Sequence, residues 1–238
     1  MDNVKMTLRK ANADRKKIDS RIDAFQEDLQ DGRVALCGYY RKSKPLIGTK
    51  TPDDYVEKCK STWQSLNDNL ILREHLNKAT LLTYGGRLEA PDEGDTFAIT
   101  ARRFNGLEYT DDTGVEVLTI AQAIARKNWF KTVVLPLLRR ISNVYTRTVS
   151  QFDQMVDSQH KALLQQVNSQ FGPESQQTAK QRLEYQESIK DQYEVIMLDP
   201  LNLSDRIEKA ILYVQDYIGD IDSLISNATE TTEVFVEQ

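Results

Sequence analysis

Residues 117 to 127, V-L-T-I-A-Q-A-I-A-R-K, change their hydrophobic pattern at Thr119. Upstream of it, Val115 and Val117 alternate with polar residues, as expected of a half-buried β-strand. Downstream, apolar residues recur every three or four positions, which is the period of an amphipathic helix, and threonine is a favoured helix N-cap. The stretch therefore predicts a strand that leads directly into a capped helix.

The helical pattern continues from Thr119 to about Phe171. Pro136 interrupts it, and because proline removes a helical hydrogen bond, the helix either kinks there or restarts with Pro136 in its first turn. A continuous helix of about 50 residues would be roughly 75 Å long at a rise of 1.5 Å per residue. A compact monomer cannot cover such a length, so we expect a partner helix.

Other helices are predicted by seams, by which we mean apolar residues in alternating steps of three and four. One seam runs from Val4 to Leu29 and ends at Asp31-Gly32, and another starts at Thr51-Pro52 and continues through Cys59 and Trp63. Segment 176–193 is a polar helix that we expect to be an exposed arm, whereas 33–50 has the glycine and proline content of a loop. The most regular seam is in the last helix: Ile207, Ile211, Val214, Ile218, Ile221 and Ile225.

Alternation and turn signals predict a small antiparallel β element at about 96–118. Asn105-Gly106 and the run from Asp111 to Gly114 would form the turns of a hairpin or a three-stranded meander. The short apolar segment 233–237 could join this element. The fold class expected is therefore mainly α, an elongated helical bundle with coiled-coil-like seams and one small β element.

The helix after Thr119 resembles the N-terminal helix, which suggests an internal repeat. Aligning Thr7 with Thr119 keeps the two seams in phase, and Leu72 to Thr80 then matches Ile221 to Thr229 at a different offset. We expect a single elongated domain, 1–238, made of half-repeats at about 1–117 and 118–238, with a helical insertion at about 140–200. The alternative is that any two heptad helices show a few matches when their seams are aligned.

Composition excludes several classes of protein. A net charge of −5 argues against general nucleic-acid binding, which needs clustered Lys and Arg. The longest apolar run, Val133 to Leu138, is much shorter than a membrane span, and the N-terminus lacks a signal peptide. Cys37 and Cys59 are too few for a disulfide scaffold or a zinc site. We therefore expect a cytoplasmic protein that has no membrane contact.

Two segments carry a resemblance to known proteins. Segment 118–127 contains a Thr-capped T-I-x-x-A-I-x-x-K pattern, and segment 221–229, I-D-S-L-I-S-N-A-T, precedes a short β segment. This combination resembles the uncharacterised septicolysin-like helical proteins and is similar to helical proteins of unknown role carried by bacteriophages. The resemblance covers mainly 118–140 and 205–236, and it implies no catalytic residues. Segment 140–200 departs from the compact septicolysin-like pattern.

The sequence contains no recognisable catalytic, nucleotide-loop or metal-binding motif. His75 and His160 have no metal-ligand spacing around them, so we expect neither a metal nor a cofactor. A basic cluster is the one candidate ligand site, because arginine recognises phosphate through paired hydrogen bonds. Its candidate residues are Arg102, Arg103, Tyr109, Arg126 and Lys127.

These observations predict a non-enzymatic assembly or binding protein, plausibly phage-encoded. It would form a homo-oligomer through long amphipathic helices, with the seam of the last helix as the oligomer contact. The alternative is an anti-defence sponge that binds a small anionic nucleotide signal through the basic cluster at an oligomer interface. Enzymatic activity ranks third.

Overall fold

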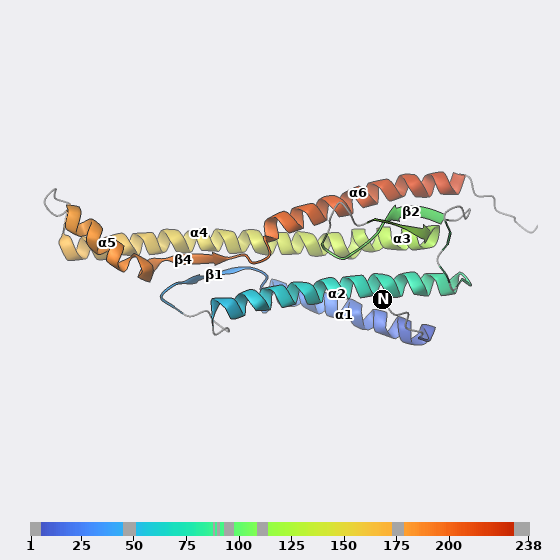
Figure 1. Ribbon diagram of the computed structural model, residues 1–238, viewed down its shortest axis with the longest axis horizontal. Helices are drawn as coiled ribbons and strands as arrows, with labels where there is room; N and C mark the ends of the chain where they lie inside the picture. The colour runs from blue at the N-terminus through green and yellow to red at the C-terminus, as the bar shows by residue number, and fades with distance from the viewer. Residues whose placement is uncertain are drawn as a thin grey trace, which may run out of the picture. The chain divides into compact units, whose positions relative to one another are not determined.

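The computed structural model describes residues 6–44, 51–87, 89, 91–92, 98–108, 114–172 and 179–230. The protein is mainly α with a small antiparallel β element, so the predicted fold class is confirmed at that level. Segment 233–237, the expected additional strand, lies outside the described residues. In chain order the elements are α1 (Leu8–Gln30), β1 (Gly38–Arg41), α2 (Pro52–Tyr84), β2 (Ala98–Arg102), β3 (Val115–Thr119), α3 (Ile120–Trp129), η1 (Phe130–Val134), α4 (Leu135–Phe171), α5 (Ala179–Tyr193), β4 (Val195–Leu198) and α6 (Leu203–Glu230), as Figure 1 shows.

Capping bonds confirm the helix starts predicted at Thr51 and Thr119, and the structure adds a third at Thr7. The Thr7 hydroxyl accepts from the Lys10 amide, and Thr51 and Asp54 each accept from the other's backbone amide. Thr119 forms a complete capping box with Gln122, because each side chain accepts from the other residue's backbone amide. Such caps satisfy amide groups that the first turn of a helix leaves without a partner.

The helix that begins after Thr119 continues past Pro136. It changes to π-helical geometry over η1, where the Leu135 amide donates to the Phe130 carbonyl, and returns to α geometry in α4. The wider turn ends two residues before the proline. An extra residue in one turn is a common way for a helix to adjust its hydrogen bonding around a residue that cannot donate. The helix therefore does not restart at Pro136; it continues through the proline after one π turn.

The chain divides into two compact units, each assembled from separate segments. Unit 1 comprises Met1–Val34, Gln64–Ile141 and Ser204–Gln238, and unit 2 comprises Ala35–Trp63 and Ser142–Leu203. Helices α2 and α4 therefore contribute residues to both units. The prediction of half-repeats at 1–117 and 118–238 concerns a different division of the chain, and it stays a prediction.

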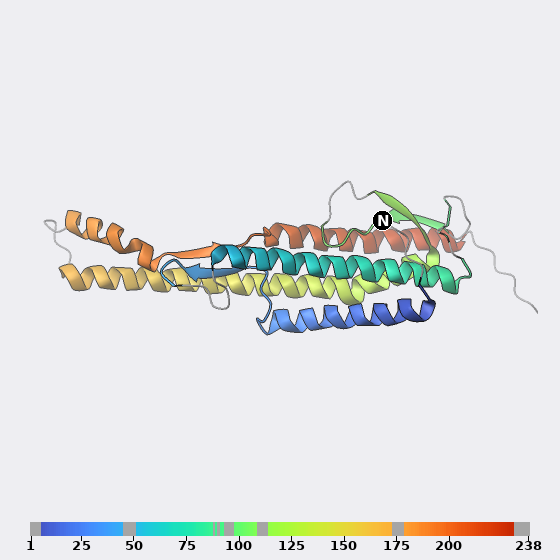
Figure 2. The same cartoon turned by 60° about the horizontal axis from the view of Figure 1, so that its bottom comes forward.

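Within unit 1, α1 lies along α2, as Figures 1 and 2 both show. Asp19 of α1 pairs with Arg73 of α2 at 3.1 Å, and Arg15 donates to Asn77 at 3.3 Å. Each of the four buried residues of α1 has a buried counterpart 112 positions later, although the later segment also buries residues that have no buried counterpart in α1: the pairs are Ala11 and Ala123, Ile18 and Phe130, Ile22 and Val134, and Leu29 and Ile141. The downstream pairing differs, because Leu72 is exposed and Ile221 is buried.

The predicted hairpin at about 96–118 is confirmed. Strands β2 and β3 pair antiparallel, with Ala98 opposite Thr119 and Arg102 opposite Val115. Leu107 is buried in a turn and belongs to neither strand. Its amide donates to the Asn67 side chain of α2, and Gly106, at φ +85°, lies so close to Asn67 that no side chain fits. In the described region, the turn at Gly106 and Leu107, which is bonded to α2, therefore lies where the meander alternative expected a third strand.

Within unit 2, two short strands were missed. Strand β1 falls inside segment 33–50, which we expected to be a loop, and it pairs antiparallel with β4 from Gly38 opposite Leu198 to Arg41 opposite Val195. Each strand has four residues, which is too short to show a clear alternation. Tyr39 of β1 contacts Phe152 of α4, with ring centroids 6.1 Å apart.

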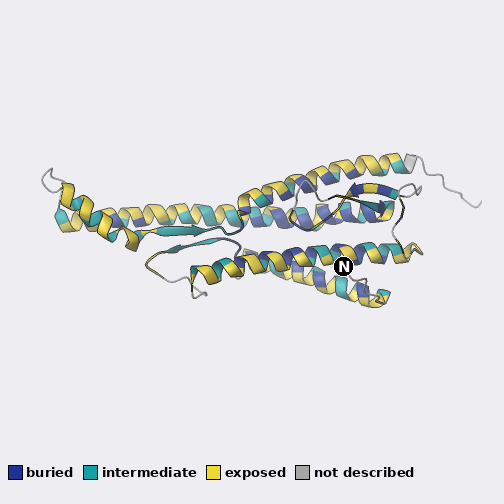
Figure 3. Ribbon diagram, in the orientation of Figure 1, coloured by how far each residue is buried: buried dark blue, intermediate teal, exposed yellow. Residues whose placement is uncertain are grey.

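Helix α5 is the least buried helix of unit 2. All of its residues are described, and none of them is buried, as the yellow and teal ribbon in Figure 3 shows. Within the described part of the chain, no helix combines the length and the apolar composition that crossing a membrane would require.

Candidate functional site

Arg126, a residue of the predicted basic cluster, lies at the centre of a buried ion network in unit 1. Its side chain is 0% exposed, and its Nε donates to Glu74 of α2 at 2.6 Å. Its Nη2 lies 2.9 Å from Glu116 of β3, and Glu116 also pairs with Lys78 at 2.6 Å. The network thus joins α2, β3 and α3, and it encloses Arg126 where a ligand cannot reach it.

Burial and pairing act in opposite directions on the acids of this network. Burial raises the pKa of Glu74 above its usual value, although Arg126 opposes the shift. For Glu116, burial would also raise the pKa, but Arg126 and Lys78 together outweigh it and lower the pKa. Nearby cations favour the charged form of a carboxyl group and desolvation disfavours it. Glu116 is therefore the acid that the network holds firmly in its ionised form.

Aromatic rings surround the network on the side of α6. Phe130 of η1 lies between Trp129 and Tyr217, with ring centroid separations of 5.8 and 4.9 Å. The guanidinium of Arg126 lies 5.7 Å from the Tyr217 ring centroid, and that of Arg73 lies 4.7 Å from the Trp129 centroid. Cation–π contacts of this kind add to the packing of an interior. The arrangement is that of a structural core.

The other predicted basic residues are near one another and have partners within unit 1. Arg102 pairs with Asp220 of α6 at 3.3 Å, Arg103 donates to the Val115 carbonyl at 3.3 Å, and Lys127 pairs with Asp222. Tyr109 lies outside the described residues. A small groove of about 140 Å³ beside Arg102 is walled by β2, Val115 and α6. Most ligand pockets are larger, roughly 300 to 1,000 Å³.

The seam of α6, predicted as the oligomer contact, is used largely inside unit 1. Ile207, Val214 and Ile221 are buried there, whereas Ile211, Ile218 and Ile225 are half-buried. The buried side of the seam packs within its own chain, so a partner could contact only its flank.

The two cysteines of unit 2 are buried thiols. Burial raises the pKa of Cys37 to about 12 and that of Cys59 to about 11. A thiol needs its ionised form to act as a nucleophile or a metal ligand, so both are poorly suited to chemistry near neutral pH. Among the described residues, no group of three or more His, Cys, Asp or Glu side chains is placed to hold a metal ion.

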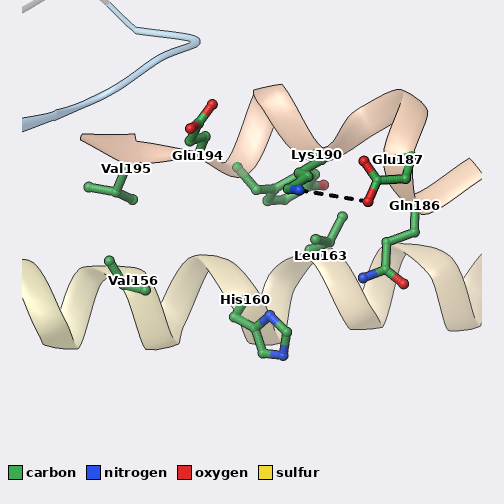
Figure 4. A pocket seen from close by; sticks show the side chains of 9 residues that line it. Val156, His160, Leu163, Gln186, Glu187, Lys190, Glu194 and Val195 are labelled. Atoms are coloured by element: carbon green, nitrogen blue, oxygen red, sulfur yellow. Dashed lines mark ion pairs between the residues drawn. The ribbon is translucent and has the colours of Figure 1, made fainter. Parts of the chain in front are cut away.

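An open concavity lies in unit 2 between α4 and α5, and we call it the hairpin cleft (Figure 4). Its volume is about 360 Å³. The lining side chains come from two helices and one strand: Val156, His160 and Leu163 of α4, Gln186, Glu187, Lys190 and Tyr193 of α5, Glu194, and Val195 of β4. Apolar groups of α4 and β4 face charged groups of α5.

Helix α5 is held at one end by contacts with the C-terminal end of α4 and at the other end by Lys42, the residue after β1. Near the hairpin turn, Arg182 donates to the Gly172 carbonyl at 2.7 Å, and Tyr185 stacks edge-on with Phe171. At the other end, Lys42 pairs with Asp191 at 3.0 Å and with Glu194 at 2.9 Å. These contacts set the width of the hairpin cleft.

The cleft residues on α5 were missed by the sequence prediction. Segment 176–193 was expected to be an exposed arm, which agrees with its burial, but no binding residue was assigned to it. The available signal was the position of Leu183 in a mostly polar helix. Leu183 is 63% exposed, and it lies one helical turn before Gln186 and Glu187 on the same face.

Comparison with known proteins adds no relative: no family model, no curated protein and no solved structure matches this chain. The resemblance to septicolysin-like and bacteriophage helical proteins therefore stays a prediction.

Proposed function

We propose that this chain is a non-enzymatic assembly protein that self-associates through its helices. One observation carries the proposal: α5 forms a hairpin with α4 in unit 2 and yet buries none of its residues. Most of the stability of a helix in a protein comes from packing an apolar face, and a 15-residue helix is marginal by itself. A second chain would supply the missing cover.

The exposed apolar residues of the hairpin support this proposal. Val156 and Leu164 of α4 and Leu183 of α5 are all exposed. Covering a fully exposed leucine contributes roughly 1.5 to 3 kcal/mol, so covering these residues on both copies offsets part of the free-energy cost of association. Two helical hairpins that face each other form a four-helix bundle, which is a common solution for this arrangement.

Two groups of side chains with potential reactivity lie in structural surroundings, which supports the same proposal. The buried thiols have raised pKa values, and the ion network around Arg126 is enclosed. We extend the proposal to a phage origin and a cytoplasmic location on the sole ground of the sequence resemblance and composition.

Light scattering coupled to size-exclusion chromatography tests the proposal on the full chain. The expected result is a mass that rises from one toward two chain masses as the concentration increases from about 1 to 100 μM, a range that matches a dissociation free energy near 7 kcal/mol. A single-chain mass over the whole range would overturn it.

The sponge alternative needs a separate measurement. Calorimetry with a panel of nucleotides would show binding that is lost in Arg102→Ala and Arg103→Ala variants. The ion pair of Arg102 with Asp220 and the enclosure of Arg126 weigh against this alternative.

A further inference from the structure

We propose that the hairpin cleft is the self-association surface and that its occupant is α5 of a second copy of this chain, paired antiparallel about a twofold axis. This inference rests on the proposed function and names the surface that performs it. In the pairing, Leu183 of each copy lies over Val156 and Val195 of the other, and Glu187 of each copy faces Lys190 of the other.

The first argument is the phase of Leu183 along α5. Residues three or four apart share a helix face, so Leu183 continues the face that carries Gln186, Glu187 and Lys190 into the cleft. Leu183 is the most exposed apolar side chain of that hairpin at 63%. The cleft and the exposed leucine therefore belong to one continuous surface, which is what an isologous contact requires.

The second argument is charge complementarity under reversal of the helix direction. Glu187 and Lys190 are three residues apart on α5, and within one chain their charged atoms are 3.7 Å apart, which is a loose contact for an exposed pair. When two copies of α5 run antiparallel with Glu187 opposite Lys190, the twofold axis repeats the same attraction. The dimer then contains two intermolecular ion pairs, each between Glu187 of one copy and Lys190 of the other.

The third argument is where this register places Leu183. It lies four residues before Glu187, so in the antiparallel partner it comes opposite the residue four after Lys190, which is Glu194. Figure 4 shows Val156 of α4 below Val195 of β4 at that end of the cleft. The leucine therefore meets apolar side chains from α4 and β4.

The fourth argument concerns the carboxylate that the leucine would approach. Glu194 pairs with Lys42 at 2.9 Å within its own chain, and Lys42 also pairs with Asp191. An apolar side chain that covers an isolated carboxylate adds a desolvation cost, and an existing cation partner lowers that cost. The ion pair with Lys42 therefore lowers the desolvation cost of placing an apolar side chain over Glu194.

The short contact predicts a dimer that depends on concentration. A helix of 15 residues is roughly 22 Å long, and its contact with a partner hairpin is smaller than a permanent interface. The partner that fits this surface is a second copy of the same hairpin, because the hairpin carries both the charged pair and the apolar residues that the pairing requires.

Sedimentation velocity on the full chain tests the surface with four variants. Leu183→Glu should raise the dimer dissociation constant at least tenfold, because it places a charge on Val156 and Val195 of the partner. Lys190→Glu should weaken the dimer as well, because it opposes two glutamates. The double reversal Glu187→Lys/Lys190→Glu should restore association to within about threefold of the wild type, since both pairs remain opposite in sign.

Leu212→Glu is the matched control. Leu212 is 53% exposed on α6 in unit 1 and is distant from the cleft in the chain, so this variant should dimerise like the wild type. Circular dichroism melting of each variant checks that the helices are retained.

The outcomes separate the surface from the function. If the wild type dimerises and Leu183→Glu, Lys190→Glu and the double reversal leave its dissociation constant unchanged, this surface is wrong while self-association stands. If Leu212→Glu disrupts the dimer in place of Leu183→Glu, the contact lies on α6. A wild type that stays monomeric overturns both proposals.

Discussion

At the residue scale, Arg126 links three elements of unit 1 through its ion pairs. It was a candidate for ligand recognition by sequence, and the structure places it in the interior of unit 1 with Glu74 and Glu116. Taking a guanidinium out of water is costly, and the cost is offset only when partners with good geometry are present. The network therefore makes the docking of β3 and α2 against α3 conditional on one side chain.

Arg126→Met tests that dependence. The variant leaves Glu74, which is 1% exposed, without its cation, and breaking a buried ion pair in this way costs roughly 3 to 5 kcal/mol. The free energy of unfolding, from a urea titration followed by circular dichroism, should fall by that amount.

A second variant separates the charge from the packing. In Arg126→Met/Glu74→Leu both members are apolar, and Glu116 keeps Lys78 at 2.6 Å. We expect this double variant to recover most of the lost stability. A double variant no more stable than Arg126→Met would show that the loss comes from packing around the Arg126 stem.

Glu116 makes the stability of unit 1 depend on acid pH. Its pKa in the folded state is below the usual value of 4.5, because Arg126 and Lys78 outweigh the effect of burial. A lowered folded-state pKa contributes stability that is complete above about 4.5 and is lost as the pH falls through the folded-state value. Lowering the pH should therefore reduce the free energy of unfolding more for this protein than for a variant without the Glu116 carboxylate.

Glu116→Gln checks the sign of this effect. The difference in unfolding free energy between wild type and variant should be largest above pH 5 and should shrink below about pH 4.5. Denaturant titrations at a series of pH values measure it. A difference that stays constant over this range, or grows toward acid, would contradict the role assigned to Glu116.

At the element scale, the turn between β2 and β3 shows why a regular pattern can mislead. The alternation that suggested a third strand contains Leu107, which is buried because Asn67 of α2 accepts from its amide. Gly106 permits the close approach, since a Cβ there would lie 2.1 Å from the Asn67 Oδ1. A contact between residues 40 positions apart decides the local conformation.

Comparing Gly106→Ala with Gly114→Ala separates backbone strain from the steric clash. Both glycines have positive φ, +85° and +71°, but an added Cβ at Gly114 meets nothing within 4 Å. Gly114→Ala should cost about 1 to 2 kcal/mol for the backbone conformation alone. Gly106→Ala should cost about 1 to 3 kcal/mol more, because it also breaks the bond from Leu107 to Asn67. Thermal unfolding of the two variants measures the difference, and equal losses would contradict the steric role of Asn67.

Features set by local chemistry were predicted from the sequence. Thr51 and Thr119 cap helices, and Gly32 ends one in the left-handed conformation, because these preferences act within one turn of the chain. Strands β1 and β4 were not predicted, because each needs the other for its hydrogen bonds and they are more than 150 residues apart. The hairpin cleft was not predicted either, because its residues on α4, α5 and β4 come together only when the hairpin folds.

At the scale of the whole molecule, the two units should differ in local stability. Unit 1 contains the aromatic core and the buried ion network, whereas α5 of unit 2 buries no residue. Segments with few buried contacts open with a smaller free energy than the core.

Hydrogen exchange followed by mass spectrometry tests this difference. At about 1 μM, backbone amides of α5 should exchange at least tenfold faster than those of α6 around Val214 and Tyr217. At about 100 μM, the cover provided by a second copy should slow exchange in α5. Equal protection of α5 and α6 in the dilute sample would contradict the burial argument.

Unit 1 is assembled from three segments that are far apart in the sequence, and this affects how it folds during synthesis on the ribosome. Its core needs Phe130 against Tyr217, and Tyr217 lies in α6, the last helix of the described chain. At roughly 5 to 20 residues per second, the chain between α1 and α6 takes on the order of ten to thirty seconds to emerge. During that interval Phe130 of η1 has no Tyr217 to pack against. We therefore expect the nascent chain to be a client of ribosome-associated chaperones until α6 has been translated.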